Sequence, residues 1–274
     1  MMSHLREVLP AGAVVAQATR WRGGGWQPGQ SDALAQEVAV ALVVNDISHT
    51  VMMATPADLQ DFALGFAFTE GLIDAPSQLY GVEVQHTDQG IELKLQVAAA
   101  CEWHLRERRR TLAGRTGCGV CGAESLGQVR RSLAPVQSQH IPVAAVSTAE
   151  AQLRERQILQ QSTGATHAAA WFDAQGQILL LREDVGRHNA LDKLIGALLT
   201  QGVDVHSGAV LVTSRASFEM VQKTVALGAG ILTAVSAPTA LAVQCAQEAN
   251  LCLAGFVRPG SLVAYTYPER LQET

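Results

Sequence analysis

The sequence lacks a long apolar run, an excess of basic charge and a regular set of cysteines. No apolar stretch reaches the roughly 18 residues that would indicate a membrane-spanning helix. The net charge of −5 over 274 residues gives no general reason to expect a nucleic-acid partner. Five cysteines, an odd number, fit a reducing compartment better than a disulfide framework. We therefore expect a cytoplasmic protein that contacts neither membrane nor nucleic acid.

The N-terminal segment has some features of a signal peptide. Val8 to Ala18 is apolar and follows Arg6, but Pro10 and Gly12 interrupt the run. We interpret residues 1–35 as an N-terminal arm.

A glycine-rich segment carries two cysteines with two residues between them. Cys118 and Cys121 alternate with three glycines within residues 117–122. Glycine allows positive φ values and leaves both sulfur atoms uncovered. Five arginines precede the pair, and nearby positive charge favours the reactive thiolate; they are Arg106, Arg108, Arg109, Arg110 and Arg115.

Spacing alone leaves several roles open for this cysteine pair. A structural zinc site needs two more ligands, and the remaining cysteines, Cys101, Cys245 and Cys252, form no second C-x-x-C. A thioredoxin-like site needs an apolar strand leading into the first thiol, which is absent here. Four interpretations of the pair stay open: metal binding, redox chemistry, covalent sulfur carriage, or an ordinary loop whose cysteines have no chemical role.

The sequence pattern of the first half of the chain predicts an α+β structure. Two apolar runs, 37–45 and 47–53, flank Asn45-Asp46 and predict a hairpin. Thr55 is expected to be the N-cap of a helix that ends near Gly71. Two alternating strands are predicted around Gly90.

The second half alternates helices and strands. Ser147 and Glu150 have the spacing of a capping box before a helix. The predicted elements that follow are strands 168–172 and 177–182, a helix ending at Gly202, strand 209–213, helix 217–227, strand 231–235, helix 238–250 and strand 251–257. This order predicts a largely parallel sheet between helices. We divide the chain into the arm, an α+β domain over 36–145 with the cysteine loop at 115–122, and an α/β domain over 146–274.

The element order is similar to the cytidine deaminase fold, a three-layer α/β/α core. Deaminases bind zinc at the starts of two core helices through H-x-E and P-C-x-x-C motifs. Here His188 is kept, but Ala190 stands in place of the glutamate, and Ser214 and Ser217 in place of the thiolates. Serine is a poor zinc ligand and alanine cannot carry a proton, so we expect no zinc and no deamination.

Five separated motifs together resemble the formate dehydrogenase accessory sulfurtransferase family (FdhD). They are Ala63–Gly71, Arg115–Gly122, Thr166–Ala170, Glu183–Lys193 and Ser217–Lys223. The resemblance covers about residues 37–265, and it implies a cytidine-deaminase-like fold.

The resemblance also implies an activity and its partners. A family member accepts sulfur from a cysteine desulfurase as a cysteine persulfide and passes it to the Mo-bis(molybdopterin guanine dinucleotide) cofactor, which activates formate dehydrogenase. Cys118 corresponds best to the persulfide carrier, and Cys121 supports it or exchanges sulfur with it. We expect a homodimer. The alternatives are a chaperone that binds the cofactor without catalysis, or a C-x-x-C redox switch.

In the family, a stretch near the C-terminus contacts the guanine dinucleotide cofactor. It corresponds here to Phe256, Val257, Arg258, Pro259, Gly260 and Ser261. Unaided, the stretch follows a predicted core strand, and ligands of α/β sheets bind outside the carboxyl ends of such strands. Arg258 offers donors to phosphate, and Gly260 permits close backbone approach. GDP is expected to act as a partial mimic of the cofactor.

Overall fold

A four-stranded sheet forms from the alternating apolar runs of the first half. The computed structural model describes residues 9–101 and 133–273, and this sheet has the order β4-β3-β6-β5. Its strands are β3 (Val38–Val44), β4 (Ile47–Ala54), β5 (Leu79–Thr87) and β6 (Gly90–Val97). Asn45 and Asp46 join β3 to β4 with φ values of 43° and 63°. Two positive φ values suit a tight hairpin turn, so the predicted hairpin is confirmed.

Helix α1 (Leu59–Thr69) covers this sheet, and its start was predicted wrongly. Phe62, Ala63 and Phe66 are buried together with β3 and β6. The N-cap is Asp58, not Thr55. The backbone N–H of Thr55 instead donates to the Asp184 carboxylate at 2.9 Å, a contact 129 residues away in the chain. This long-range hydrogen bond overrides the local capping pattern.

A six-stranded sheet forms the larger unit, with the order β13-β12-β11-β10-β8-β9. Its strands are β8 (His167–Asp173), β9 (Ile178–Asp184), β10 (Gly208–Val212), β11 (Ile231–Ala234), β12 (Cys252–Arg258) and β13 (Ser261–Thr266). Only β10–β11 and β11–β12 pair in parallel. The expectation of a largely parallel sheet is therefore wrong. The β8–β9 and β12–β13 connections are short turns, which can join only antiparallel neighbours.

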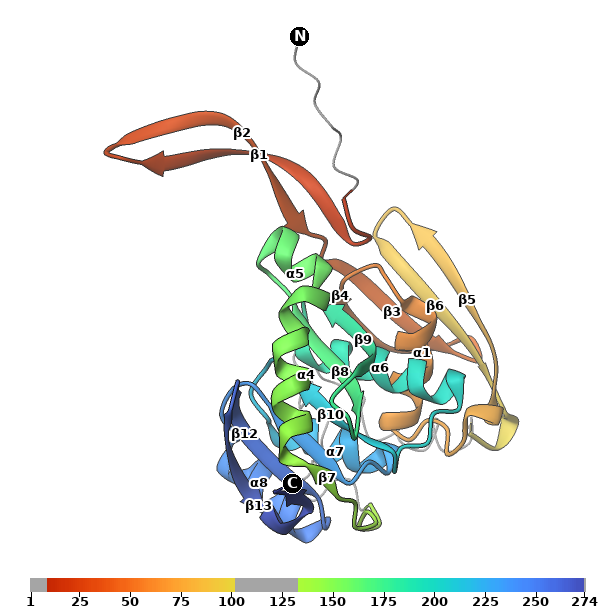
Figure 1. The fold of residues 1–274 in the computed structure, drawn as a ribbon. Helices are drawn as coiled ribbons and strands as arrows, with labels where there is room; N and C mark the ends of the chain where they lie inside the picture. The colour runs from red at the N-terminus through yellow and green to blue at the C-terminus, as the bar shows by residue number, and fades with distance from the viewer. Residues whose placement is uncertain (1–8, 102–132, 274) are drawn as a thin grey trace.

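Helices cover both faces of the six-stranded sheet (Figure 1). One face packs against α6 (Arg187–Gln201), α7 (Phe218–Leu227) and α8 (Ala240–Glu248). The other packs against α4 (Val143–Arg156), which the short helix α5 (Ile158–Thr163) follows. The mixed α/β class is confirmed and the sheet lies between two helical layers. The closer likeness to cytidine deaminases stays a prediction.

The predicted capping box at Ser147 and Glu150 is wrong, because α4 already begins at Val143 after Pro142. Both residues therefore lie inside the helix. Ser147 accepts a hydrogen bond from the backbone N–H of Gly260 at 3.3 Å. Residue 145 also lies inside α4, and the domain limits 36–145 and 146–274 stay a prediction.

The N-terminal arm forms a long hairpin of β1 (Ala13–Arg22) and β2 (Gly25–Ala35). It extends away from the rest of the chain (Figure 1). The remaining short elements are β7 (Ile141–Pro142), β14 (Leu271–Gln272) and the 3-10 turns η1 (Pro76–Gln78) and η2 (Pro268–Arg270). Within the described ranges, no helix has the length and apolar character needed to cross a membrane.

Buried charges join the two sheet units. Lys223 on α7 donates to Asp192 on α6 at 2.9 Å and to Glu70, next to α1, at 2.8 Å. Burial opposes the charge on Lys223, but the two carboxylates outweigh it and raise the lysine pKa above its usual value. On the same interface Lys193 pairs with Asp184 at 2.6 Å, and both side chains are fully buried. These pairs fix how α1, α6 and α7 pack together.

Candidate functional site

The two loop cysteines cannot be placed in the structure. Cys118, Cys121 and the five arginines before them lie outside the described residues. Their roles therefore stay predictions.

Two of the described cysteines are poorly suited to sulfur chemistry. Cys101 and Cys252 are both buried. Burial raises the pKa of the Cys101 thiol, and it raises the pKa of Cys252 to about 12. A thiol must ionise to act as a nucleophile, so neither of these two is activated.

The predicted cofactor stretch at the end of β12 is a β-bulge followed by a turn. Gly255 pairs with Val263 and Arg258 with Ser261, so two residues of β12 lie opposite one residue of β13. Bulges of this kind re-aim side chains and are common beside active sites. The sequence predicted a ligand-binding turn here, and the structure shows that the strand is distorted at that point.

Five of the six predicted residues in this stretch reach the surface. Phe256 is 47% exposed and has a φ of 52°, which is unusual for a bulky side chain. Val257 is fully buried in the core beside α4, so its side chain cannot face a ligand. The exposed remainder are Arg258, Pro259, Gly260 and Ser261.

Hydrogen bonds fasten this turn to the neighbouring strand and to α4. The Nη1 atom of Arg258 donates to the carbonyl oxygens of Val235 at 2.6 Å and Val257 at 2.7 Å. Gly260 has a φ of 74°, in the region that favours glycine, and its N–H donates to Ser147. The turn is thereby held at the carboxyl ends of β11 and β12.

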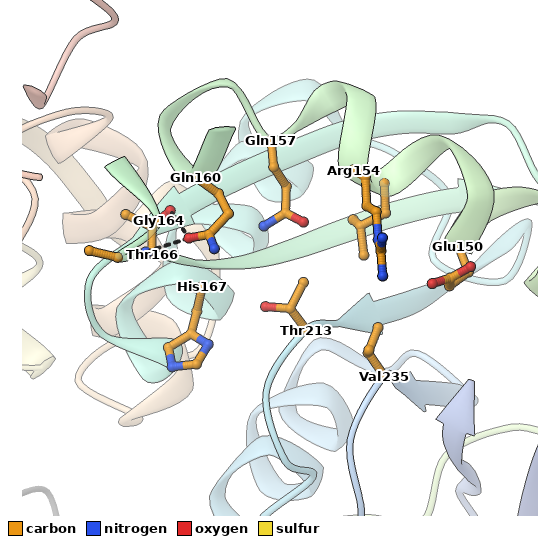
Figure 2. A pocket seen from close by; sticks show the side chains of 11 residues that line it. Glu150, Arg154, Gln157, Gln160, Gly164, Thr166, His167, Thr213 and Val235 are labelled. Atoms are coloured by element: carbon orange, nitrogen blue, oxygen red, sulfur yellow. Dashed lines mark hydrogen bonds between the residues drawn. The ribbon is translucent and has the colours of Figure 1, made fainter. Parts of the chain in front are cut away.

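A pocket of about 450 Å³ lies beside the turn, between α4, α5 and the strand ends (Figure 2). Thr213 and Val235 line it just after β10 and β11. Thr166 and His167 line it at the start of β8. Its volume falls in the range of about 300–1,000 Å³ that is usual for small-molecule sites. The carboxyl edge of a sheet is also where α/β proteins bind ligands.

Polar side chains from α4 and the α4–α5 junction point into this pocket. Gln157 extends toward Thr213 and Arg154 toward Val235, and Glu150 lies at the end of the pocket beyond Arg154 (Figure 2). Glu150 and Gln157 are each only 6% exposed. Neither side chain makes a hydrogen bond or ion pair with another described residue. Buried polar groups normally have partners, so these two are open to a ligand.

The opposite end of the pocket lies at His167. Burial lowers the pKa of His167, and the charges of Arg187 and His188 lower it further. The buried Nε atom of Arg187 has no hydrogen-bond partner within the described part of the chain. His167 therefore lies near the guanidinium of Arg187.

Other residues of the Glu183–Lys193 motif have structural roles. Glu183 accepts hydrogen bonds from the N–H groups of Leu159 and Gln160, both at 2.8 Å, at the start of α5. Asp184 pairs with Lys193. His188 pairs with Glu219 at 2.6 Å.

Metal binding by the described residues finds no support. Within residues 9–101 and 133–273, no group of three His, Cys, Asp or Glu side chains is arranged to hold a metal ion. The expectation of a zinc-free protein still awaits an experimental test.

Sequence reasoning missed most of the pocket. Thr166 and His167 belong to a motif that we quoted without assigning it a role. Glu150 was interpreted as part of a helix cap. Gln157 and Thr213 carried no sequence signal, because the pocket forms only when α4 packs across the strand ends.

Comparison with known proteins gives a consistent result. The model of the FdhD/NarQ family matches residues 35–272. "Sulfur carrier protein FdhD" of Cupriavidus necator is 56% identical over 277 residues, covering 97% of this chain and 95% of that protein. The protein of the same name from Bordetella bronchiseptica is 53% identical over 260 residues and covers 94% of each chain.

A solved structure shares the fold. A crystal structure reported as a formate dehydrogenase accessory protein from Desulfotalea psychrophila aligns with a TM-score of 0.74 and 23% identity. The alignment covers 95% of this chain and 99% of that one. Together with the family match over most of the sequence, these findings show that the chain belongs to the FdhD/NarQ family.

Proposed function

We propose that this protein is a sulfurtransferase that carries sulfur to the Mo-bis(molybdopterin guanine dinucleotide) cofactor of formate dehydrogenase. One observation carries the proposal: a protein named as a sulfur carrier is 56% identical over nearly the whole chain. The sequence supplies the required cysteine pair, Cys118 and Cys121. The proposed partners are a cysteine desulfurase and formate dehydrogenase in the cytoplasm, and the proposed assembly is a homodimer.

The proposed sulfur transfer balances with the two cysteines and an external dithiol as reductant. The Cys118 thiolate attacks the terminal sulfur of the desulfurase persulfide, and the S–S bond of the desulfurase breaks as a new one forms on Cys118. The Cys121 thiolate then attacks the inner sulfur of Cys118 and releases hydrosulfide to the cofactor. The pair is oxidised to a disulfide, which a cellular dithiol reduces before the next cycle.

The described residues support a cofactor site at the carboxyl edge of the six-stranded sheet. Phe256 offers an exposed ring for stacking against a base, and Arg258 offers N–H donors to oxygen atoms of the cofactor. The neighbouring pocket contributes buried polar groups. A rigid edge for binding and a separate glycine-rich loop for sulfur divide the work between two parts of the chain.

A cofactor chaperone without sulfur chemistry is the second candidate. It is favoured by one observation, namely that the described residues of the pocket lining and of the turn at 256–261 include no cysteine. Such a chaperone would bind GDP and the cofactor, but it would never carry a persulfide.

GDP titration tests the assigned cofactor edge. We expect Arg258→Ala to weaken GDP binding by about 1–3 kcal/mol, because a charge-assisted hydrogen bond is lost. Persulfide formation on Arg258→Ala should be unchanged. Cys118→Ala is the matched control, and it should bind GDP normally while failing to activate formate dehydrogenase. If Cys118→Ala loses GDP affinity and Arg258→Ala keeps it, the assigned cofactor site is wrong.

A further inference from the structure

Glu150 is a buried carboxylate without a structural role that the fold explains. It lies inside α4, so it does not cap the helix. It is 6% exposed, lines the pocket and has no hydrogen-bond or ion-pair partner among the described residues. A nearly buried side chain in a pocket wall that has no partner within the protein leaves its carboxylate available to a ligand.

The nearest basic residue along α4 does not pair with Glu150. Arg154 lies four residues further along α4, a spacing at which opposite charges often pair. No ion pair within 4 Å forms between them, and Arg154 is exposed. The carboxylate therefore faces the pocket without a neutralising cation.

The chemistry of a carboxylate restricts what it can bind. Both of its oxygen atoms only accept hydrogen bonds, and together they accept two parallel N–H donors. Among the nucleobases, guanine presents two adjacent donors on one edge, N1–H and the N2 amino group. Adenine and cytosine present an amino donor beside an acceptor, and uracil presents one N–H between two carbonyls. A lone carboxylate in a nucleotide-sized pocket thus favours guanine.

The charges near the two ends of the pocket determine which way round a nucleotide binds. Glu150 and Gln157 are seven residues apart along the chain, which corresponds to roughly 10 Å of helix. The far end lies at His167, near the guanidinium of Arg187, whose buried Nε atom has no hydrogen-bond partner among the described residues. Phosphate groups are repelled by Glu150 and attracted by the Arg187 guanidinium. The turn at residues 256–261, called here the Phe256 turn, lies at the Glu150 end of the pocket. It is held there by the hydrogen bonds of Arg258 to Val235 and of Gly260 to Ser147.

We propose that Glu150 determines base specificity in this pocket by accepting hydrogen bonds from N1–H and N2–H of a guanine nucleotide. The inference rests on the proposed function, because it treats the pocket as part of the cofactor site. The base lies between α4 and the Phe256 turn, and the phosphates extend toward His167.

Replacing the Glu150 carboxylate by an amide should change which nucleotide the pocket prefers. Loss of a purely structural side chain would not change that preference. Xanthine keeps the N1–H donor of guanine but has a carbonyl oxygen in place of the N2 amino group. The Glu150→Gln side chain accepts from N1–H and donates to that oxygen. We expect the wild type to prefer GDP over xanthosine diphosphate by about tenfold or more, and Glu150→Gln to reverse the preference. Glu155→Gln is the matched control, an exposed glutamate on the same helix that should keep the wild-type order.

The wild type alone provides a second test that needs no variant to fold. Inosine diphosphate lacks the N2 amino group, so calorimetric titration should show it binding about tenfold or more weaker than GDP. Equal affinity for the two nucleotides overturns the assignment of Glu150. So does a Glu150→Gln protein that still prefers GDP, and in both cases GDP binding by the wild type leaves the cofactor site itself standing. A wild type that binds none of these nucleotides overturns both the inference and the cofactor site.

Discussion

Phe256 combines an exposed aromatic ring with a backbone conformation that disfavours every side chain. Its φ is 52°, and the ring is about half exposed. A left-handed conformation costs a non-glycine residue roughly 1–2 kcal/mol. The ring recovers little of that cost by burial, which is why we connect the strain to ligand binding instead of to stability.

Two substitutions separate strain from function at this position. Phe256→Gly and Phe256→Ala both remove the ring, but only glycine accepts the positive φ freely. We expect Phe256→Gly to exceed Phe256→Ala in unfolding free energy by about 1 kcal/mol in urea denaturation. Both should bind GDP more weakly than the wild type. Unchanged GDP affinity in both variants would remove Phe256 from the site.

The His188–Glu219 pair predicts a pH-dependent contribution to stability. The His188 imidazole, 2.6 Å from the carboxylate, lowers the pKa of Glu219 below its ordinary value of 4.5, although burial opposes this. A carboxyl with a lowered pKa stabilises the folded state above its unfolded pKa, and this is lost as pH falls through the folded pKa. The advantage of wild type over Glu219→Gln in unfolding free energy should therefore shrink below about pH 4.5.

The exposed Glu155→Gln is the control for this measurement. The unfolding free energy of Glu155→Gln should differ little from that of the wild type at every pH, because surface charges away from partners contribute little to stability. If the difference in unfolding free energy between wild type and Glu219→Gln is the same at pH 7 and below about pH 4.5, the contact with His188 does not stabilise the fold.

At the residue scale, sequence patterns located the turn at 256–261 but not the pocket beside it. A strand followed by Arg-Pro-Gly is visible in the chain, and so is its position at a strand end. Glu150 carried a misleading signal, since Ser147 and Glu150 match a capping box although both lie inside α4. Local spacing cannot distinguish a cap from a pocket wall when the helix starts a turn earlier.

At the element scale, helices α1 and α6 cross at close range through two glycines. A Cβ atom on Gly65 would meet the backbone oxygen of Asp192, and one on Gly196 would meet that of Asp61. The two helices therefore touch backbone to backbone. Gly65 belongs to one of the motifs quoted from the sequence, and this contact supplies a physical reason for a glycine there.

Substitution of Gly196 should reverse the usual effect of alanine in a helix. Gly→Ala inside a helix normally stabilises by about 1 kcal/mol. Here we expect Gly196→Ala to lower the unfolding free energy by about 1–3 kcal/mol, because the added methyl forces the helices apart. Gly25→Ala is the control, since nothing lies within 4 Å of the position of its Cβ. Thermal unfolding would contradict the close crossing if Gly196→Ala were as stable as the wild type.

Elements with strong local signals were predicted well, and those set by distant contacts were not. The Asn45-Asp46 hairpin and the end of α6 at Gly202 follow from turn and cap chemistry. The start of α1 was missed because Thr55 bonds to Asp184 across the molecule. Strand direction was also misjudged, because it depends on which strands the short turns connect.

At the scale of the whole molecule, the two sheet units form one body through buried charges. Lys193 and Lys223 donate to Thr55 and Glu70 of the first half of the chain, and they also pair with Asp184 at the end of β9 and Asp192 within α6. The contacts of Lys193 with Thr55 and of Lys223 with Glu70 cannot be read from sequence, because each joins residues more than 130 positions apart in the chain. The arrangement fixes the carboxyl edge of the larger sheet, where the pocket and the Phe256 turn meet.

The central claim is that Cys118 carries sulfur, and intact-mass spectrometry tests it most directly. The protein is incubated with a cysteine desulfurase and cysteine, and the peptide containing Cys118 and Cys121 is then analysed without reductant. The account predicts a gain of one sulfur atom on this peptide that is lost in Cys118→Ala. A peptide that gains no sulfur while the desulfurase is active, together with full activation of formate dehydrogenase by the Cys118→Ala/Cys121→Ala protein, would contradict it.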